Sequence, residues 1–191
     1  MSDYSQPVFY RFNQDSLLLV KAIVESELLP KKILDVGAGS GIIGIELALR
    51  MQIPEVHFLE LQKDWKPFLE TNIDELIPHT RTRIFWSSVS DWSSPQKYDL
   101  IVSNPPYYLP LNGNISPDPV RAHCRSFLKD DWVILLSKCM KALVPEGSAW
   151  FITPKENLVH IEKSTPLKPE VIQSGDLVIL KFSSSEYKSK S

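Results

Sequence analysis

The chain has 191 residues, 43% apolar and 23% charged, with a net charge of -2. This balance predicts one globular domain, residues 1–182, followed by a Ser/Lys tail, 183–191, that we expect to be disordered. The acidic charge removes the simplest argument for a nucleic-acid binder, and two cysteines without ligand spacing exclude a disulfide scaffold. With no signal pattern or long apolar run, we expect a cytoplasmic monomer that binds neither membrane nor metal.

Short apolar runs alternate with longer amphipathic segments along the chain. Strands are expected at 33–36, 56–60, 83–86, 98–103, 149–153, 170–173 and 177–182. Helices are expected at 15–28, 42–51, 63–76, 130–143 and 156–162. This alternation predicts an α/β fold, a Rossmann-like, doubly wound, mostly parallel seven-stranded sheet with a C-terminal antiparallel hairpin.

Four polar landmarks fall at or just after the ends of predicted strands. They are the glycine-rich residues 37–41, Glu60, Asp91 and Asn104. In doubly wound sheets, ligands bind outside the carboxyl ends of the strands, where the strand order reverses. The sequence therefore predicts a ligand site at this edge. Lys31 and Lys32 precede the first strand, so we expect them at the opposite edge as solvated surface charge.

The glycine-rich loop, residues 35–41 (DVGAGSG), suits a nucleoside cofactor. Gly37, Gly39 and Gly41 let the backbone turn tightly and expose amides at a helix start. Residues 39–44 also satisfy the dinucleotide pattern GxGxxG, so a nicotinamide cofactor remains an alternative. Asp35 favours S-adenosyl-L-methionine, because a carboxylate attracts its ammonium and sulfonium groups and would repel a pyrophosphate.

The same cofactor gives roles to three further residues. Glu60 would accept hydrogen bonds from both ribose hydroxyls, Leu61 would lie against one adenine face, and Asp91 would accept from the adenine amino group. The structural alternatives are a helix cap for Asp35 or Asp91 and a solvated acid for Glu60. Both interpretations stay open at this point.

The segment 104–107 (NPPY) follows the fourth predicted strand and suits an amino group on a planar acceptor. The side-chain oxygen of Asn104 and the carbonyl of Pro105 can accept both N–H bonds of one amino group. Pro106 fixes the turn. Tyr107, with Tyr108, would stack on the acceptor. Methyl transfer to nitrogen then needs positioning more than a strong base.

These motifs closely resemble the amino-methyltransferase branch of the class I S-adenosylmethionine-dependent methyltransferases, over nearly the whole chain. Residues 7–19 and 112–125 are similar to those of the bacterial tRNA adenine-N6 methyltransferases that modify the adenosine beside the anticodon of valine tRNA. The resemblance implies that Asp15 covers the methionine end of the cofactor. It also implies that Arg121, His123 and Arg125 approach the RNA backbone, which would make binding salt-dependent.

Our hypothesis is therefore a methyltransferase that modifies the exocyclic amine of adenine in structured RNA, most simply tRNA. Release-factor glutamine methyltransferases share the Asn-Pro-Pro-Tyr motif but add an amino-terminal domain. DNA adenine methylation requires base flipping and a recognition domain. A cofactor-binding partner subunit without activity is the alternative from a different class, and intact Asn104 and Tyr107 argue against it.

Overall fold

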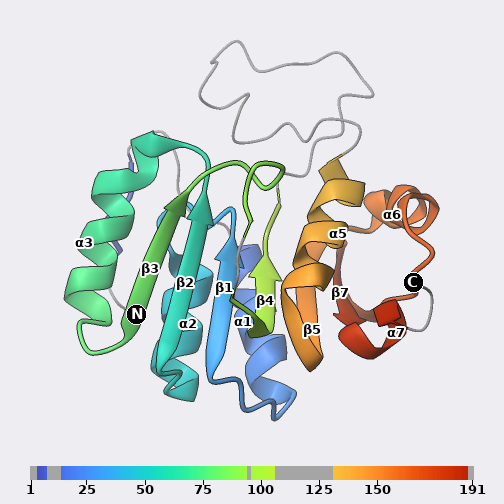
Figure 1. The fold of residues 1–191 in the computed structure, drawn as a ribbon, viewed down its shortest axis with the longest axis horizontal. Coiled ribbons are helices and arrows are strands. Elements are labelled where there is room, and N and C mark those ends of the chain that lie inside the picture. The colour runs from blue at the N-terminus through green and yellow to red at the C-terminus, as the bar shows by residue number, and fades with distance from the viewer. Residues whose placement is uncertain (1–3, 8–13, 94–95, 106–130, 189–191) are drawn as a thin grey trace.

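Helices and strands alternate along the chain in the predicted order (Figure 1). The computed structural model describes residues 4–7, 14–93, 96–105 and 131–188. The helical elements are α1 (Gln14–Glu25), α2 (Ile42–Met51), η1 (Lys63–Trp65), α3 (Lys66–Leu76), α5 (Asp131–Ala142), η2 (Lys155–Asn157), α6 (Leu158–Ser164) and α7 (Ser184–Lys188). The strands are β1 (Lys32–Val36), β2 (Glu55–Glu60), β3 (Arg81–Trp86), β4 (Tyr98–Ser103), β5 (Leu143–Pro154), β6 (Glu170–Ser174) and β7 (Leu177–Ser183).

The strands form one seven-stranded sheet in the order β3-β2-β1-β4-β5-β7-β6. β1 pairs in parallel with β2 on one side and with β4 on the other, so the strand order reverses beside β1. β7 pairs antiparallel with both β5 and β6. The predicted doubly wound sheet with its C-terminal hairpin is confirmed, and the reversal creates the crevice at which such sheets bind ligands.

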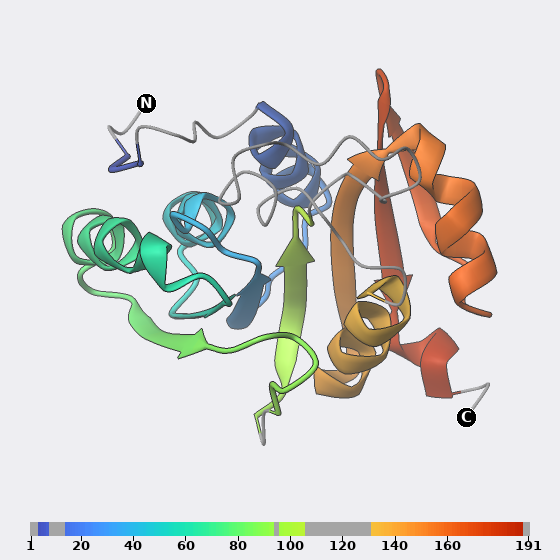
Figure 2. The same ribbon diagram turned by 90° about the horizontal axis from the view of Figure 1, so that it is seen from above.

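Helices cover both faces of the sheet (Figure 2). Consecutive strand residues point to opposite faces, so a strand contributes side chains to the buried clusters on both faces of the sheet. On β4, Leu100 and Val102 join the cluster under α1, α2 and α3, whereas Ile101 joins the cluster under α5. Because both faces are covered, the central strands β1 and β4 are buried along most of their length, as in parallel sheets generally.

β5 begins earlier than the sequence predicts, at Leu143. Residues 145–147 (PEG) resemble a turn, but they continue the strand through an irregular register between Tyr98 and Leu100 of β4. A Cβ atom on Gly147 would lie 3.0 Å from the Tyr98 carbonyl oxygen. The glycine therefore allows a close approach between two backbones, and the local pattern that signals a turn does not reveal it.

The carboxyl-terminal segment also differs from the expected disordered tail. Residues Ser184–Lys188 form α7, which follows β7 directly. Tyr187 packs against the cluster under α5, and Ser184 is buried. One aromatic side chain thus gives a Ser/Lys-rich segment enough apolar surface to be ordered.

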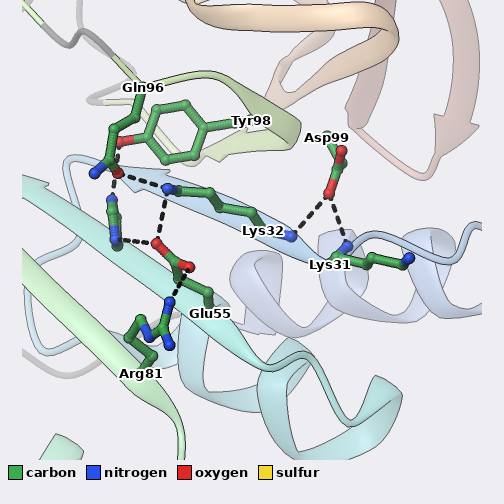
Figure 3. A network of polar contacts seen from close by, with 8 residues as sticks. Lys31, Lys32, Glu55, Arg81, Gln96, Tyr98 and Asp99 are labelled. Carbon is green, nitrogen blue, oxygen red and sulfur yellow. Dashed lines mark hydrogen bonds and ion pairs between the residues drawn. The ribbon is translucent and has the colours of Figure 1, made fainter.

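Charged side chains form a network at the amino ends of β1, β2 and β4 (Figure 3). Lys32 Nζ lies 2.7 Å from Glu55 Oε1, and His57 Nε2 lies 3.0 Å from the same oxygen. Asp99 Oδ2 accepts hydrogen bonds from the backbone N–H groups of Lys31 and Lys32, each at 2.8 Å. Lys32 lies at the edge we predicted, but it is an ion-pair partner and not a freely solvated charge.

Two findings concern membrane insertion and metal binding. Among the described residues, no helix has both the length and the apolar character needed to cross a membrane. Within the same ranges, no group of three or more His, Cys, Asp or Glu side chains is arranged to hold a metal ion.

Candidate active site

Three predicted site residues lie next to one another at the carboxyl edge of the sheet. Val36, the last residue of β1, pairs with Leu59 of β2 and with Ser103 of β4. The residues that follow these three are Gly37, Glu60 and Asn104. Strand register thus brings the glycine loop, the acidic residue and the Asn-Pro motif to the point where strand order reverses.

The glycine loop adopts the left-handed backbone that its sequence requires. Gly37, Gly39 and Gly41 all have positive φ, and at Gly41 φ is 85°. A Cβ atom on Gly41 would also lie 2.6 Å from Leu69 Cδ1, so a larger residue would be both strained and overpacked. The loop then opens α2 at Ile42, and the Gly41 N-cap position supplies no side-chain hydrogen bond to this first turn.

Glu60 closes β2 beneath this loop. Its Oε2 accepts a hydrogen bond from the Gly39 N–H and its Oε1 accepts one from the Gln62 N–H, each at 2.8 Å. Burial raises the pKa of the Glu60 carboxyl, while these backbone donors oppose the rise. The carboxylate is 5% exposed, so the alternative of a solvated acid is wrong. The Leu61 backbone also donates to this carboxylate, which can accept about four hydrogen bonds in all, so it retains acceptor capacity for a hydroxyl group.

Asp35 lies deeper than expected. The residue is 1% exposed, and its Oδ2 accepts a hydrogen bond of 2.9 Å from the Gly44 N–H in the first turn of α2. Its Oδ1 is buried and has no hydrogen-bond partner among the described residues. Burial raises the pKa of this carboxyl to about 7. The hydrogen bond from Gly44 to Asp35 corresponds to the helix-cap alternative, although Asp35 lies in β1 and not in α2. A role of Asp35 toward the cofactor stays a prediction.

Two buried groups give opposite pH dependences to stability. Burial and the Lys32 ammonium lower the pKa of His57 to about 4, below its unfolded value, so its contribution to the free energy of unfolding is lost as pH falls. The pKa of Asp35 is raised to about 7, so its contribution is lost as pH rises. Where the two titration ranges overlap, each slope is at most about 1 kcal/mol per pH unit, and the two slopes oppose each other.

Removing either Asp35 or His57 should therefore reveal the pH dependence of stability that the other residue causes. Between about pH 5 and pH 6, urea unfolding of Asp35→Asn should show stability rising with pH relative to the wild type, by roughly 1 kcal/mol per unit. His57→Gln should show it falling by a similar amount. Parallel profiles for all three proteins would contradict the opposed titrations.

Asn104 follows β4 and contacts the first turn of α1. Its Nδ2 donates to Ser16 Oγ at 3.0 Å, between residues 88 positions apart. Ser103 Oγ donates to the Val36 carbonyl at 2.7 Å and so joins the ends of β4 and β1. The sequence analysis did not identify Ser16. The sequence feature that could have identified Ser16 is its position: it is a polar residue on the same helix face as the buried Leu19, Val20 and Ile23.

Asn72 of α3 is a second buried polar residue that the sequence analysis missed. Its Nδ2 donates to the carbonyls of Ser40 and Ser5, at 2.9 and 3.0 Å, and its Oδ1 accepts from the Ser5 N–H at 2.7 Å. Asn72 therefore joins the glycine loop to the amino-terminal residues 4–7. An asparagine on an amphipathic helix carries no local pattern that predicts this role.

The remaining predicted cofactor residues have varied surroundings. Asp15 lies in the first turn of α1, beside Ser16. Leu61 is 59% exposed, directly after Glu60. Asp91 is exposed in the turn after β3, where its Oδ2 accepts from Ser88 Oγ at 2.7 Å. Their roles toward a cofactor stay predictions.

Of the predicted catalytic segment, Asn104 and the buried Pro105 are described. The other predicted catalytic and substrate residues lie outside the described residues. They are Pro106, Tyr107, Tyr108, Arg121, His123 and Arg125.

Comparisons with known proteins identify the family of this chain. Residues 8–158 match the family described as Methyltransferase small domain. A tRNA1(Val) (adenine(37)-N6)-methyltransferase from Tolumonas auensis is 35% identical over 127 residues, 66% of this chain and 52% of that protein. The chain therefore spans about half the length of this relative.

Solved structures share the fold. A ribosomal protein L11 methylase from Lactobacillus delbrueckii subsp. bulgaricus superimposes with a TM-score of 0.68 at 19% identity, covering 95% of this chain and 90% of the other. The N-methyltransferase NodS from Bradyrhizobium japonicum, in complex with S-adenosyl-L-homocysteine, gives 0.61 at 15% identity, with coverage of 89% and 85%. At these identities the likeness concerns the fold alone.

Proposed function

Since this chain belongs to the Methyltransferase small domain family, we propose that it transfers a methyl group from S-adenosyl-L-methionine to the exocyclic amine of an adenine in tRNA. The observation that carries this proposal is the position of Asn104. It directly follows β4, and strand register places it beside Gly37 at the start of the glycine loop. An acceptor of amino protons therefore adjoins a loop that suits a nucleoside cofactor.

The cofactor would lie across the ends of β1 and β2. Glu60 would accept the ribose hydroxyls, and the amides opening α2 would face the ligand. The bound cofactor supplies an electrophilic methyl group with a neutral thioether as leaving group. The family assignment favours this cofactor over the nicotinamide alternative.

On the acceptor side, Asn104 would orient the amine. Its Nδ2 donates to Ser16 Oγ, and its Oδ1 would accept a hydrogen bond from the substrate amino group. The carbonyl of Pro105 would accept a hydrogen bond from the second N–H of the same amino group. Held by two acceptors, the nitrogen would direct its lone pair toward the methyl group, and positioning would supply most of the rate.

The tRNA acceptor rests on the resemblance of residues 7–19 and 112–125 and on the Tolumonas relative. Such an acceptor would place the reaction in the cytoplasm, with Arg121, His123 and Arg125 as candidate contacts to the RNA backbone. Because those contacts would displace counterions from phosphates, transfer to tRNA should weaken as salt rises.

The proposal is tested by supplying labelled S-adenosyl-L-methionine with separate bacterial tRNA, DNA and protein fractions. We expect label in tRNA, recovered as N6-methyladenosine after nucleoside digestion, and a KM for tRNA that rises steeply between low and physiological salt. Label recovered as methylglutamine would instead favour the release-factor alternative. Cofactor binding without transfer to any fraction would contradict the proposed function and favour the inactive-subunit alternative.

A further inference from the structure

Asn72 of α3 joins two segments that lie far apart in the sequence. Its Nδ2 donates to the Ser40 carbonyl of the glycine loop and to the Ser5 carbonyl, at 2.9 and 3.0 Å. Its Oδ1 accepts from the Ser5 N–H at 2.7 Å. All three partners are backbone groups, each of which either donates or accepts and never does both. A rotated amide would turn its nitrogen to an N–H and its oxygen to two carbonyls, so these contacts hold the carboxamide in one orientation.

The peptide unit between Ser40 and Gly41 is held at both ends. Its carbonyl accepts from Asn72 Nδ2, and its N–H donates to the Ala38 carbonyl at 2.8 Å. On either side of Ser40, Gly39 and Gly41 have φ values of 55° and 85°, and glycine has the widest choice of backbone conformations. Because glycines give the loop this freedom, a hydrogen bond from outside the loop restricts it, and Asn72 supplies one.

The packing of α3 fixes the position of Asn72. Leu69, one helical turn earlier, is fully buried, and a Cβ atom on Gly41 would lie 2.6 Å from its Cδ1. Ile73 is also buried, and Asn72 itself is 1% exposed. An amide buried this completely needs hydrogen-bond partners. The glycine loop and residues 4–7 supply them.

Residues 4–7 have a second attachment, to α2. The Tyr4 hydroxyl donates to Glu46 Oε1 at 2.9 Å, and Glu46 also forms an ion pair of 2.8 Å with Arg50. Pro7 is buried. Figures 1 and 2 show residues 4–7 beside α3. The segment is therefore docked against α2, which follows the glycine loop, and against α3, which packs on the loop.

We propose that Asn72 is a positioning residue for the cofactor, which couples the docking of residues 4–7 to the conformation of the glycine loop. The inference rests on the proposed function, because it requires that the loop binds S-adenosyl-L-methionine. While the segment is docked, the Ser5 backbone holds the carboxamide so that Nδ2 reaches the Ser40 carbonyl. When the segment leaves, Asn72 loses both bonds to Ser5, and the loop gains freedom that cofactor binding must remove. Docking and cofactor binding thus favour each other, and such coupling is reciprocal.

Position 5 offers a matched pair of variants. Ser5→Ala keeps both backbone groups that contact Asn72. Ser5→Pro removes the N–H and puts a ring carbon where the hydrogen points at Asn72 Oδ1, so it excludes the docked arrangement. Calorimetric titration should give Ser5→Ala the wild-type cofactor Kd, and Ser5→Pro a Kd about fivefold higher, the equivalent of one hydrogen bond.

The effect should fall on binding and not on turnover. At saturating cofactor, both variants should keep a kcat for tRNA close to that of the wild type, because the acceptor side of the site is unchanged. Equal cofactor Kd values for Ser5→Pro and Ser5→Ala would overturn the proposal. Both variants leave Asn72 in place, so this comparison decides the question of coupling even if substitutions of Asn72 prevent folding.

Asn72→Ala tests whether Ser5 acts through Asn72. Alone, it should raise the cofactor Kd at least as much as Ser5→Pro, since it also removes the bond to Ser40. In the Asn72→Ala background, Ser5→Pro should have no further effect, because the residue that transmits docking is gone. A further increase of about fivefold in that background would assign the effect to the segment alone and overturn the role of Asn72.

Hydrogen exchange of the Ser5 amide gives a readout that does not depend on the reaction. The signal of this amide in a proton–nitrogen spectrum is assigned by its absence in Ser5→Pro. Reciprocal coupling predicts that saturating S-adenosyl-L-methionine slows the exchange by about the factor by which Ser5→Pro raises the cofactor Kd. Unchanged exchange in a protein that has bound the cofactor would overturn the coupling alone. A wild-type protein that binds no S-adenosyl-L-methionine would contradict the proposed function, and this inference with it.

Discussion

Asn104→Ala is expected to lower kcat for methyl transfer at least about a thousandfold and to leave the cofactor Kd nearly unchanged. The substitution removes the oxygen that we propose accepts a hydrogen bond from the substrate amine, and with it would remove both the alignment of the nitrogen and the stabilisation of charge that develops on it. Positioning and preorganised acceptors each contribute several kcal/mol in such reactions. Single-turnover rates with saturating cofactor, together with calorimetric titration of the cofactor, measure the two quantities separately.

Because Asn104 contacts Ser16, the stability of the Asn104→Ala variant should be measured as well. Alanine at position 104 leaves Ser16 Oγ without its bond to Nδ2, so thermal unfolding should accompany the kinetics. A stable Asn104→Ala protein that keeps most of the wild-type rate would contradict the assignment of Asn104 as the acceptor of the amine.

Glu60→Gln should raise the cofactor Kd by roughly a hundredfold. Hydrogen bonds from hydroxyl groups to a carboxylate contribute about 1.5–3 kcal/mol each, and an amide replaces one acceptor by a donor. The amide nitrogen would also meet the N–H of Gly39 or Gln62, which the carboxylate oxygens now accept. Equilibrium titration of S-adenosyl-L-methionine measures the change.

The opposite end of β2 offers the control for this substitution. Glu55 is the first residue of the strand that Glu60 ends, and it pairs with Lys32 and His57. Glu55→Gln makes the same chemical change at the opposite edge of the sheet. It should lower stability by weakening that network and leave cofactor affinity intact. Equal affinities for Glu60→Gln and the wild type would contradict the ribose assignment.

Features of this molecule that depend on neighbouring residues were predictable from the sequence, and features that depend on residues far apart in the sequence were not. The order of strands and helices was predicted correctly because apolar periodicity is local, and the resemblance to methyltransferases is confirmed at the level of the family. Gly147 and Tyr187 were not predictable in the same way. The first lets β5 approach the β4 backbone, and the second orders α7, so each depends on a distant partner.

The sequence by itself determined which segments form strands and helices and indicated candidate site residues, because glycine turns, proline turns and strand ends are properties of neighbouring residues. Only the tertiary structure decided how those residues are used. It buried Asp35 against α2, enclosed Glu60 between backbone amides, and brought Ser16 to Asn104 across 88 positions. Packing sets such contacts, because a buried polar group takes whichever partner the fold brings within reach.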